Sequence, residues 1–431
     1  MEEGQLHYLA TQLTNRYEFT LYYGEKIIGF PIFRNNGWYI ISEVNNIERK
    51  VLPSQIKNSA IVERANEMVR ENKESIKYKA DIRFKTLVII GAGASFNYSD
   101  EAKIETPPLT IDLFKDRFQD LINNFPGVES LSSQILKAKD IESYFQNQWD
   151  QIVKTYNPYL LNELIDVQFY LHFLFKKIST SNIDFRKNNY IAFFRTLRDF
   201  LISKGSNEKA LVVSFNYDTI LEKSIEKMLN YNFDHLDNYV DYSYRNILLF
   251  KPHGSWNWGR YFDQYKLQEI TRVNERIKMD ALNKIIYNKG VSLASLHTAL
   301  NNDTQVISSF DWDKYYFPQL LIPYKSKDSY MMPERHTEIL TTFLPHVDRI
   351  IIIGWKGSEE KFKTLLKNTI GNKRIEIIYV NKKDDTLVTE LTEALPNAIF
   401  KEFAPHESSQ GTFTELNEFI MEQGTKQILG R

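Results

Sequence analysis

The segment Leu87–Ser95, with the sequence LVIIGAGAS, constrains the fold of this chain more than any other stretch. Its first four residues are apolar and include adjacent β-branched residues, which is typical of a buried β-strand. A glycine turn follows directly, and without Cβ atoms its backbone N–H groups can approach a pyrophosphate closely. Phe96 stands where the common dinucleotide fingerprint has a third glycine, so a strand-to-helix corner without a ligand is the alternative interpretation.

Four further apolar segments have the same character, and each ends in a polar or glycine residue. They are Val212–Asp218, Leu249–Ser255, Arg349–Gly354 and Ile375–Asn381. Strands that are apolar throughout are typical of a parallel sheet covered by helices on both faces. In such sheets, ligands bind outside the carboxyl ends of the strands. The sequence therefore predicts an α/β fold with a Rossmann-like parallel sheet and a binding site at the strand ends.

Taken together, these motifs resemble those of the sirtuin-like family. The resemblance rests on GAGAS at 91–95, FNYD at 215–218, KPHGS at 251–255, IGW at 353–355 and VN at 380–381. It covers about Lys85 to Phe403 and points to the bacterial branch whose members are NAD-cleaving effectors in antiphage defence. It implies a Rossmann-like domain with a helical insert, and NAD as the substrate. By analogy, it also implies a second defence protein as partner, either a HerA-type ATPase or a short Argonaute.

Charge and cysteine content narrow the function further. The 431 residues include 54 basic and 55 acidic ones, a balance that gives no indication of nucleic-acid binding. Without a long apolar stretch or a signal-peptide pattern, we expect a cytoplasmic protein that does not enter a membrane. The absence of cysteine excludes a thiolate zinc site and a cysteine nucleophile. Sirtuins that deacylate lysine typically carry a four-cysteine zinc module, so the resemblance favours simple NAD consumption, and we expect no metal.

The N-terminal residues 1–80 are expected to form a separate module. An alternating, aromatic β-meander with an Asn-Gly hairpin turn at 35–37 is followed by a charged helix from Ile61 to about Lys77. This module is either a docking surface for a partner or another subunit, or a structural cap on the main domain. A homo-oligomer is expected.

Residues 81–431 are expected to form the sirtuin-like domain. A helical insert at about 109–206, which begins its helices near Thr110, would form a second lobe over the nicotinamide end of the site. A further insertion at about 256–320 shows no clear strand and carries a charged helix from Leu267 to Ile286. This insertion is a candidate lid, oligomer contact or partner surface.

Three residues after the second and third strands suit cleavage of the N-glycosidic bond of NAD. Because the nicotinamide leaving group is already cationic, the reaction needs an oriented ribose, a stabilised oxocarbenium-like centre and a base. The Asn216 amide can hold a ribose hydroxyl or water, Asp218 can accept from the nicotinamide carboxamide, and neutral His253 can take a proton. The structural alternatives are Asp218 as the cap of a helix from Thr219 to Asn230, and His253 as a buried histidine bonded to backbone.

Residues that bind the rest of the dinucleotide are expected at the other strand ends. The phosphates would lie against the glycine turn, and the adenosine half against the fourth and fifth strands. The candidates are Gly91, Ala92, Gly93, Ser95, Gly354, Ser358 and Asn381. At Phe215 and at Gly354–Ser358 the chain differs from the zinc-bearing sirtuins, which carry Gln and Gly-Thr-Ser there.

The resulting hypothesis is an NAD⁺ glycohydrolase that releases nicotinamide and ADP-ribose as the NAD-depleting effector of a bacterial antiviral defence system. The alternative from another class is a non-catalytic module that binds NAD or ADP-ribose and reports on it. Binding alone needs neither Asn216 nor His253, which argues against that alternative. A protein deacylase is disfavoured by the missing cysteines.

Overall fold

The chain forms two units, Met1–Ile82 and Arg83–Arg431. The first holds an antiparallel sheet, and the second holds a parallel sheet and a lobe built around a smaller antiparallel sheet. The computed structural model describes residues 17–21, 26–34, 37–42, 48–51, 56–61, 83–96, 107–138, 140–155, 157–180, 188–205, 208–243, 245–275, 277–307, 314–324, 330–380 and 385–401.

The sheet of the first unit has five strands in the order β4-β3-β2-β1-β5. They are β1 (Tyr17–Leu21), β2 (Lys26–Arg34), β3 (Gly37–Ser42), β4 (Glu48–Val51) and β5 (Ile56–Ile61). Arg34 pairs with Gly37, which is the register of the predicted two-residue hairpin connection. The prediction that Ile61 begins a helix is wrong, because Ile61 ends β5 and pairs with Tyr17 of β1. The rest of that expected helix lies outside the described residues.

Six strands form the parallel sheet of the second unit, and their arrangement confirms the predicted Rossmann-like fold. They are β6 (Arg83–Ile90), β7 (Glu208–Ser214), β8 (Ile247–Phe250), β12 (Arg349–Ile353), β13 (Ile375–Val380) and β14 (Ala398–Lys401). In the order β14-β13-β12-β6-β7-β8, every neighbouring pair is parallel. The chain places β7 and β8 on one side of β6 and then returns to place β12 on the other. Ligands bind at such a reversal in doubly wound sheets.

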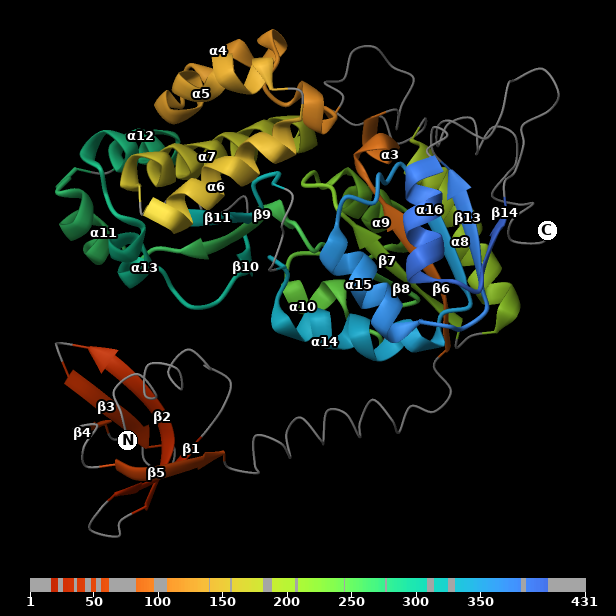
Figure 1. Cartoon of the computed structure of the whole chain (residues 1–431), viewed down its shortest axis with the longest axis horizontal. Helices are drawn as coiled ribbons and strands as arrows, with labels where there is room; N and C mark the ends of the chain where they lie inside the picture. The colour runs from red at the N-terminus through yellow and green to blue at the C-terminus, as the bar shows by residue number, and fades with distance from the viewer. Residues whose placement is uncertain are drawn as a thin grey trace. The chain divides into compact units, whose positions relative to one another are not determined.

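Helices cover both faces of the parallel sheet, because its strands are apolar on both sides. The side chains of Leu87, Val212 and Ile350 are fully buried. The two helix pairs are α8 (Asn189–Lys204) with α9 (Ile220–Leu229) on one face, and α15 (Glu360–Thr369) with α16 (Asp385–Ala394) on the other (Figure 1). Shorter elements complete this half: α3 (Ala92–Phe96), α10 (Leu236–Tyr239), α14 (Glu334–Phe343) and η5 (Leu344–His346).

The two insertions pack together into one lobe beside the parallel sheet (Figure 1). The first contributes η2 (Thr110–Asp112), η3 (Asp116–Phe118), α4 (Gln119–Ile122), α5 (Pro126–Lys137), α6 (Ile141–Thr155) and α7 (Pro158–Thr180). The second contributes β9 (Gly254–Tyr261), α11 (Gln264–Thr271), α12 (Met279–Lys289), α13 (Leu293–Ala299), β10 (Gln305–Val306) and β11 (Tyr316–Leu320). Helix α7 contacts α5, α6, α12, β9 and β11, so it is the centre of the lobe.

Three expectations for these insertions are wrong. Residues 256–320 do contain strands, because β9 pairs antiparallel with both β10 and β11. Gly254, Gly259 and Asn257 interrupt the apolar pattern of β9, which hides it from a reading of periodicity. The single helix expected from 267 to 286 is two helices, since Arg272 adopts the left-handed conformation (φ 54°) that ends α11. The helix expected from Thr110 is mostly two short 3₁₀ turns.

His172 on α7 shows how a buried histidine serves the packing of this lobe. Its Nδ1 lies 2.7 Å from the carbonyl oxygen of Trp256 on β9, and its Nε2 lies 2.9 Å from the hydroxyl of Tyr316 on β11. Burial lowers the pKa of His172 to about 3, so the ring is neutral at physiological pH. This histidine joins one helix to two strands and needs no ligand to satisfy it.

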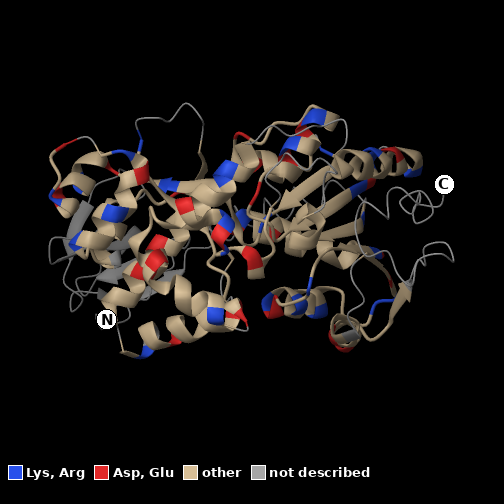
Figure 2. Cartoon of the chain, turned by 90° about the horizontal axis from the view of Figure 1, so that it is seen from above, with Lys and Arg blue, Asp and Glu red and all other residues tan. Residues whose placement is uncertain are grey.

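Basic and acidic residues are interspersed over both halves of the second unit in the view of Figure 2. This distribution agrees with the near-equal numbers of the two kinds in the sequence. Among the helices that the structure describes, none combines the length and the apolar character needed to cross a bilayer.

Candidate functional site

Four neighbouring strands bring the predicted catalytic motifs to one edge of the sheet. Ile90, the last residue of β6, pairs with Ser214 of β7, and Ile353 of β12 pairs with Ile90 from the other side. The segments that follow these strands, and the segment after β8, therefore begin at the same level. This alignment places the glycine turn, the Asn-x-Asp turn and the His-Gly-Ser turn side by side, as expected for parallel strands.

The glycine turn after β6 is packed directly against the end of β12. Gly91 N donates to the Ile353 carbonyl oxygen (3.0 Å), and Gly93 N donates to the Gly354 carbonyl oxygen (3.1 Å). A Cβ on Gly91 would lie 2.4 Å from the Gly354 oxygen, and a Cβ on Gly354 would lie 2.2 Å from Ala94 N. Close backbone packing at the strand reversal is therefore enough to require glycine at these positions. These two N–H groups donate to protein and not to a phosphate.

Asn216 follows β7 and is held by a buried hydrogen-bond network. Its Nδ2 donates to the hydroxyl of Ser95 (2.8 Å), which also lies 2.7 Å from the hydroxyl of Tyr190 on α8. Asn216 is only 6 % exposed, and its Oδ1 has no hydrogen-bond partner among the described residues. An amide that is fixed through its nitrogen and presents a buried, unsatisfied oxygen is prepared to accept one hydrogen bond.

Ser95 is the centre of this network, which changes the role expected for it. Nearby Asp218 is fully buried, and burial raises the pKa of its carboxyl, while the charge of Lys251 opposes that effect. Burial raises the pKa of Tyr190 well above its ordinary value, so its hydroxyl keeps its proton. The Ser95 side chain is therefore occupied by Tyr190 and Asn216, and its expected contact with a phosphate is not present in this arrangement.

Asp218 forms the predicted Asx turn at the start of α9, but the N-cap residue of this helix is Thr219 and not Asp218. Its Oδ1 accepts a hydrogen bond from Ile220 N at 3.0 Å, and its side chain is buried. Beneath it, fully buried Lys251 pairs with Glu222 at 2.6 Å and donates to the Asp218 carbonyl oxygen and to Ser255. Burial raises the pKa of Glu222, and Lys251 opposes that effect. One buried cation thus joins β8, α9 and β9 directly behind the Asn-x-Asp turn.

His253 lies in the turn after β8 and is 5 % exposed. Its Nδ1 lies 3.2 Å from the carbonyl oxygen of Phe215, the residue that precedes Asn216. A carbonyl oxygen can only accept, so Nδ1 carries the hydrogen and Nε2 is the basic nitrogen of the neutral ring. Gly254, at φ +75°, permits this turn, because a Cβ there would lie 2.0 Å from the Gln319 oxygen.

Three residues of this site were given no role from the sequence. Glu359 is buried, and its Oε1 lies 3.6 Å from His253 Nε2. Trp355 is buried as well and donates from Nε1 to Glu359 Oε2. The predicted motif after β12 ended at Ser358, and nothing in the local pattern distinguishes Glu359 from Glu360 beside it. Tyr190 was assigned only to the apolar face of a helix, and its hydroxyl contact with Ser95 depends on tertiary packing.

The remaining residues predicted to bind the dinucleotide, Ala92, Ser358 and Asn381, give little information about a binding site. Ala92 is the half-buried first residue of α3, and Ser358 is half-buried just before α15. Asn381 lies outside the described residues. In the part of the chain with described coordinates, no group of three or more His, Cys, Asp or Glu side chains could hold a metal ion.

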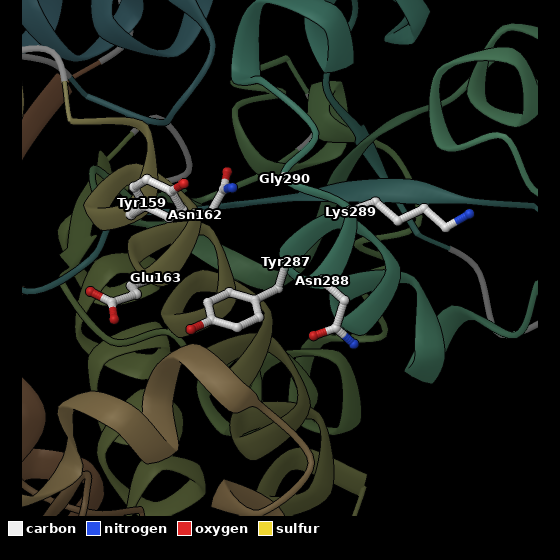
Figure 3. A pocket seen from close by; sticks show the side chains of 7 residues that line it. All are labelled: Tyr159, Asn162, Glu163, Tyr287, Asn288, Lys289 and Gly290. Carbon is white, nitrogen blue, oxygen red and sulfur yellow. The ribbon is translucent and has the colours of Figure 1, made fainter.

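A surface hollow of about 510 Å³ lies in the second lobe, between the start of α7 and the end of α12 (Figure 3). Its lining residues are Tyr159, Asn162, Glu163, Tyr287, Asn288, Lys289 and Gly290. Burial raises the pKa of Glu163, and a hydrogen bond from Ser130 opposes that effect. None of the predicted catalytic residues lines this hollow.

No protein-family model matches the chain, and no curated protein is significantly similar to it. The likeness to sirtuin-like proteins therefore rests on the five short motifs, and the fold is established by the strand order.

Proposed function

We propose that this protein cleaves NAD⁺ to nicotinamide and ADP-ribose. The observation that supports it most strongly is the state of Asn216. Its amide is anchored through Nδ2, its buried Oδ1 has no hydrogen-bond partner among the described residues, and the adjoining Phe215 carbonyl orients His253. A binding module would not need a buried amide oxygen and a buried imidazole beside each other at neighbouring strand ends.

The chemistry assigns one role to each side chain. Asn216 Oδ1 accepts a hydrogen bond from a ribose hydroxyl or from the attacking water and so orients it. The C1′–N bond breaks with its electron pair moving to the nicotinamide nitrogen, which becomes neutral. A C1′–O bond forms to water, and His253 Nε2 takes the proton that water loses. Asp218, which also accepts a hydrogen bond from the first residue of α9, would face the nicotinamide carboxamide.

Binding of the phosphates would use groups other than those first expected. Gly91 N, Gly93 N and the Ser95 hydroxyl all make hydrogen bonds within the protein. Their contribution in this proposal is to shape the strand reversal and to hold Asn216, while the dinucleotide lies over the same edge of the sheet. No metal takes part in this scheme.

The biological role follows from the family resemblance alone. We propose that the protein is an NAD-depleting effector of a bacterial antiviral defence system, kept silent until a second protein activates it. A HerA-type ATPase or a short Argonaute is the kind of partner that the resemblance suggests. The second candidate function, a non-catalytic NAD or ADP-ribose sensor, predicts binding without turnover.

A timed assay of NAD⁺ tests the proposal. The purified protein, alone and with the product of its neighbouring gene, is incubated with NAD⁺, and nicotinamide and ADP-ribose are separated by chromatography. We expect both products in equal amounts, and we expect His253→Ala to abolish them because its Nε2 is the proposed base. His346→Ala, which changes an exposed histidine, is the matched control and should retain full activity. Cleavage at the wild-type rate in His253→Ala would overturn the catalytic assignment.

A further inference from the structure

His253 and Glu359 form a buried pair that joins two segments far apart in the sequence. His253 Nε2 and Glu359 Oε1 are 3.6 Å apart, and their side chains are 6 % and 9 % exposed. Since the hydrogen of the neutral imidazole is on Nδ1, facing the Phe215 carbonyl, Nε2 is the nitrogen that can accept a proton, and it lies close to the carboxylate. A carboxylate at this distance favours a positive charge on the ring. The geometry therefore stabilises the imidazolium form that a general base becomes when it takes a proton.

The carboxylate of Glu359 is held in place from its other oxygen. Trp355 Nε1 donates to Oε2, and the Trp355 ring stacks on Phe215 with a centroid distance of 5.6 Å and an interplanar angle of 11°. Phe215 in turn provides the carbonyl that orients His253 and packs its ring 4.9 Å from the imidazole. Each of these four residues therefore contacts the next, from Glu359 to Trp355, Phe215 and His253 and back to Glu359. As a result, the positions of the carboxylate and the imidazole depend on each other.

A structural role as a helix cap does not explain this placement. Glu359 is the N-cap residue of α15, but its side chain makes no capping hydrogen bond. Instead, it is the main-chain oxygen of Glu359 that accepts hydrogen bonds from backbone N–H groups of the first turn of α15. The donors are Phe362 N and Lys363 N, at 3.0 Å each. The carboxylate is therefore directed at Trp355 and His253.

Two tyrosines near the His253–Glu359 pair, Tyr217 and Tyr330, are titratable but carry no charge. Tyr217 stacks near the His253 ring at 6.0 Å, and burial, with Glu142 and Glu359 adding to it, raises the pKa of Tyr217 well above its ordinary value. Tyr330 also has a raised pKa, from burial and then from Glu359, and Lys361 lies over its ring at 4.6 Å. Both tyrosines are neutral at physiological pH, so among the described side chains around the pair it is Glu359 that can place a negative charge beside an imidazolium at His253.

We propose that Glu359 is the positioning residue of His253, a role that rests on the proposed NAD⁺ cleavage. In the hydrolytic step the O–H bond of water breaks, its oxygen bonds to C1′, and its proton moves to His253 Nε2. Glu359 Oε1 lies 3.6 Å from Nε2, and its negative charge stabilises the imidazolium until the proton is released to solvent. Glu359 does not touch the reacting atoms, and it acts only through the orientation and the charge state of His253.

Nuclear magnetic resonance of the full-length protein with ¹³C-labelled histidine tests the pair directly. The His253 signal is assigned by its loss in His253→Ala, and its titration midpoint is compared between the wild type and Glu359→Gln. Glutamine keeps an oxygen that accepts from Trp355 Nε1, so the fold should be retained. Removal of the negative charge makes the imidazolium less favourable, and we expect the midpoint to move to lower pH by about 1 or more.

Glu360→Gln is the matched control, because Glu360 is the next residue, its side chain is 75 % exposed, and it pairs with Lys363. It should leave the His253 midpoint unchanged. Glu359→Asp, which keeps a carboxylate on a shorter side chain, should give a midpoint between those of the wild type and Glu359→Gln. An unchanged midpoint in Glu359→Gln, in a protein whose circular dichroism matches the wild type, would overturn the proposal.

Kinetics separate this proposal from the proposed function. In Glu359→Gln we expect kcat for NAD⁺ cleavage to fall by about 10- to 100-fold with little change in KM, and the acid limb of its pH profile to move to lower pH. A shifted midpoint in a protein that never cleaves NAD⁺ would uphold the pair and overturn the proposed function. Wild-type kinetics in Glu359→Gln would overturn the positioning role and leave the proposed function intact.

Discussion

Asn216 illustrates how much of the site depends on single hydrogen bonds. An asparagine side chain can satisfy its hydrogen-bonding groups in several ways, and here one donor is used by Ser95 while the oxygen is left buried without a partner among the described residues. Leaving such an oxygen unsatisfied costs about 1–3 kcal/mol in a folded protein. A substrate hydroxyl that satisfies it would recover part of that cost on binding, and would be oriented as it does so.

Asn216→Ala is expected to lower the rate of NAD⁺ cleavage far more than the affinity for NAD⁺. Loss of one oriented contact in the transition state typically costs about 3 kcal/mol, which corresponds to a hundredfold or more in kcat. Calorimetry with the non-turning-over variant should still detect NAD⁺ binding, since the rest of the strand edge is unchanged.

Ser95→Ala is the companion variant, because it leaves the Asn216 amide in place but removes the hydroxyl that holds Nδ2. Its rate should lie between those of the wild type and Asn216→Ala. Normal turnover with weakened binding in Asn216→Ala would instead place Asn216 among the binding groups, without a role in the chemical step.

At the level of secondary-structure elements, the meeting of the β6 and β12 turns determines the shape of the site. The glycine turn was predicted as a cradle for phosphates, but its glycines are required by the close approach of Gly354. The turn after β6 donates two backbone hydrogen bonds to the end of β12, so the two segments form one rigid corner at the strand reversal. That corner sets the position of α3, and through Ser95 the position of Asn216.

Gly354→Ala and Gly290→Ala together test this packing. Both glycines have a positive φ, +62° and +60°, so both alanines incur the left-handed penalty of about 1–2 kcal/mol. A Cβ on Gly290 meets nothing within 4 Å, whereas a Cβ on Gly354 would lie 2.2 Å from Ala94 N. We expect Gly354→Ala to lose about 3 kcal/mol or more of unfolding free energy in urea, because crowding adds to the strain. Equal losses in the two variants would contradict the inferred contact.

At the scale of the whole molecule, two insertions separated in the sequence by the segment from α8 to β8 fold into one lobe. Helix α7 of the first packs on β9 and β11 of the second, and His172 bonds to both strands. Because β9 starts at the His-Gly-Ser turn, this lobe is connected directly to the proposed catalytic residues. A partner that shifts the lobe would therefore move the turn that carries His253.

The edges of the sheet in the first unit, Met1–Ile82, suggest a role in association. In its described sheet β4 and β5 are the outermost strands, and unpaired strand edges are common sites of association. The unit contributes no group to the proposed chemistry. A chain that begins at Ile82 should therefore keep its thermal transition but differ from the full-length protein in oligomer mass or partner binding, as measured by light scattering and pull-down. If both properties are unchanged, the unit is only a cap.

The sequence by itself determined the strands of the parallel sheet and the motifs at their ends. Leu87–Ile90, Val212–Val213 and Ile350–Ile353 are apolar throughout, because a strand buried on both faces has no exposed positions. Parallel strands also bring their carboxyl ends to one edge, which is why Asn216 and His253 could be placed near each other without coordinates.

Only the tertiary structure decided which groups touch at that edge. Glu359 is buried, whereas Glu360 beside it is exposed. This difference depends on how α15 packs after the Gly354 turn, and no local pattern encodes that packing. Likewise, Ser95 could be predicted near a strand end, but its bonds to Tyr190 and Asn216 depend on how α8 packs on the sheet. Contacts between segments distant in the chain are set by the packing of whole elements, so a single sequence specifies the elements more clearly than the pairs.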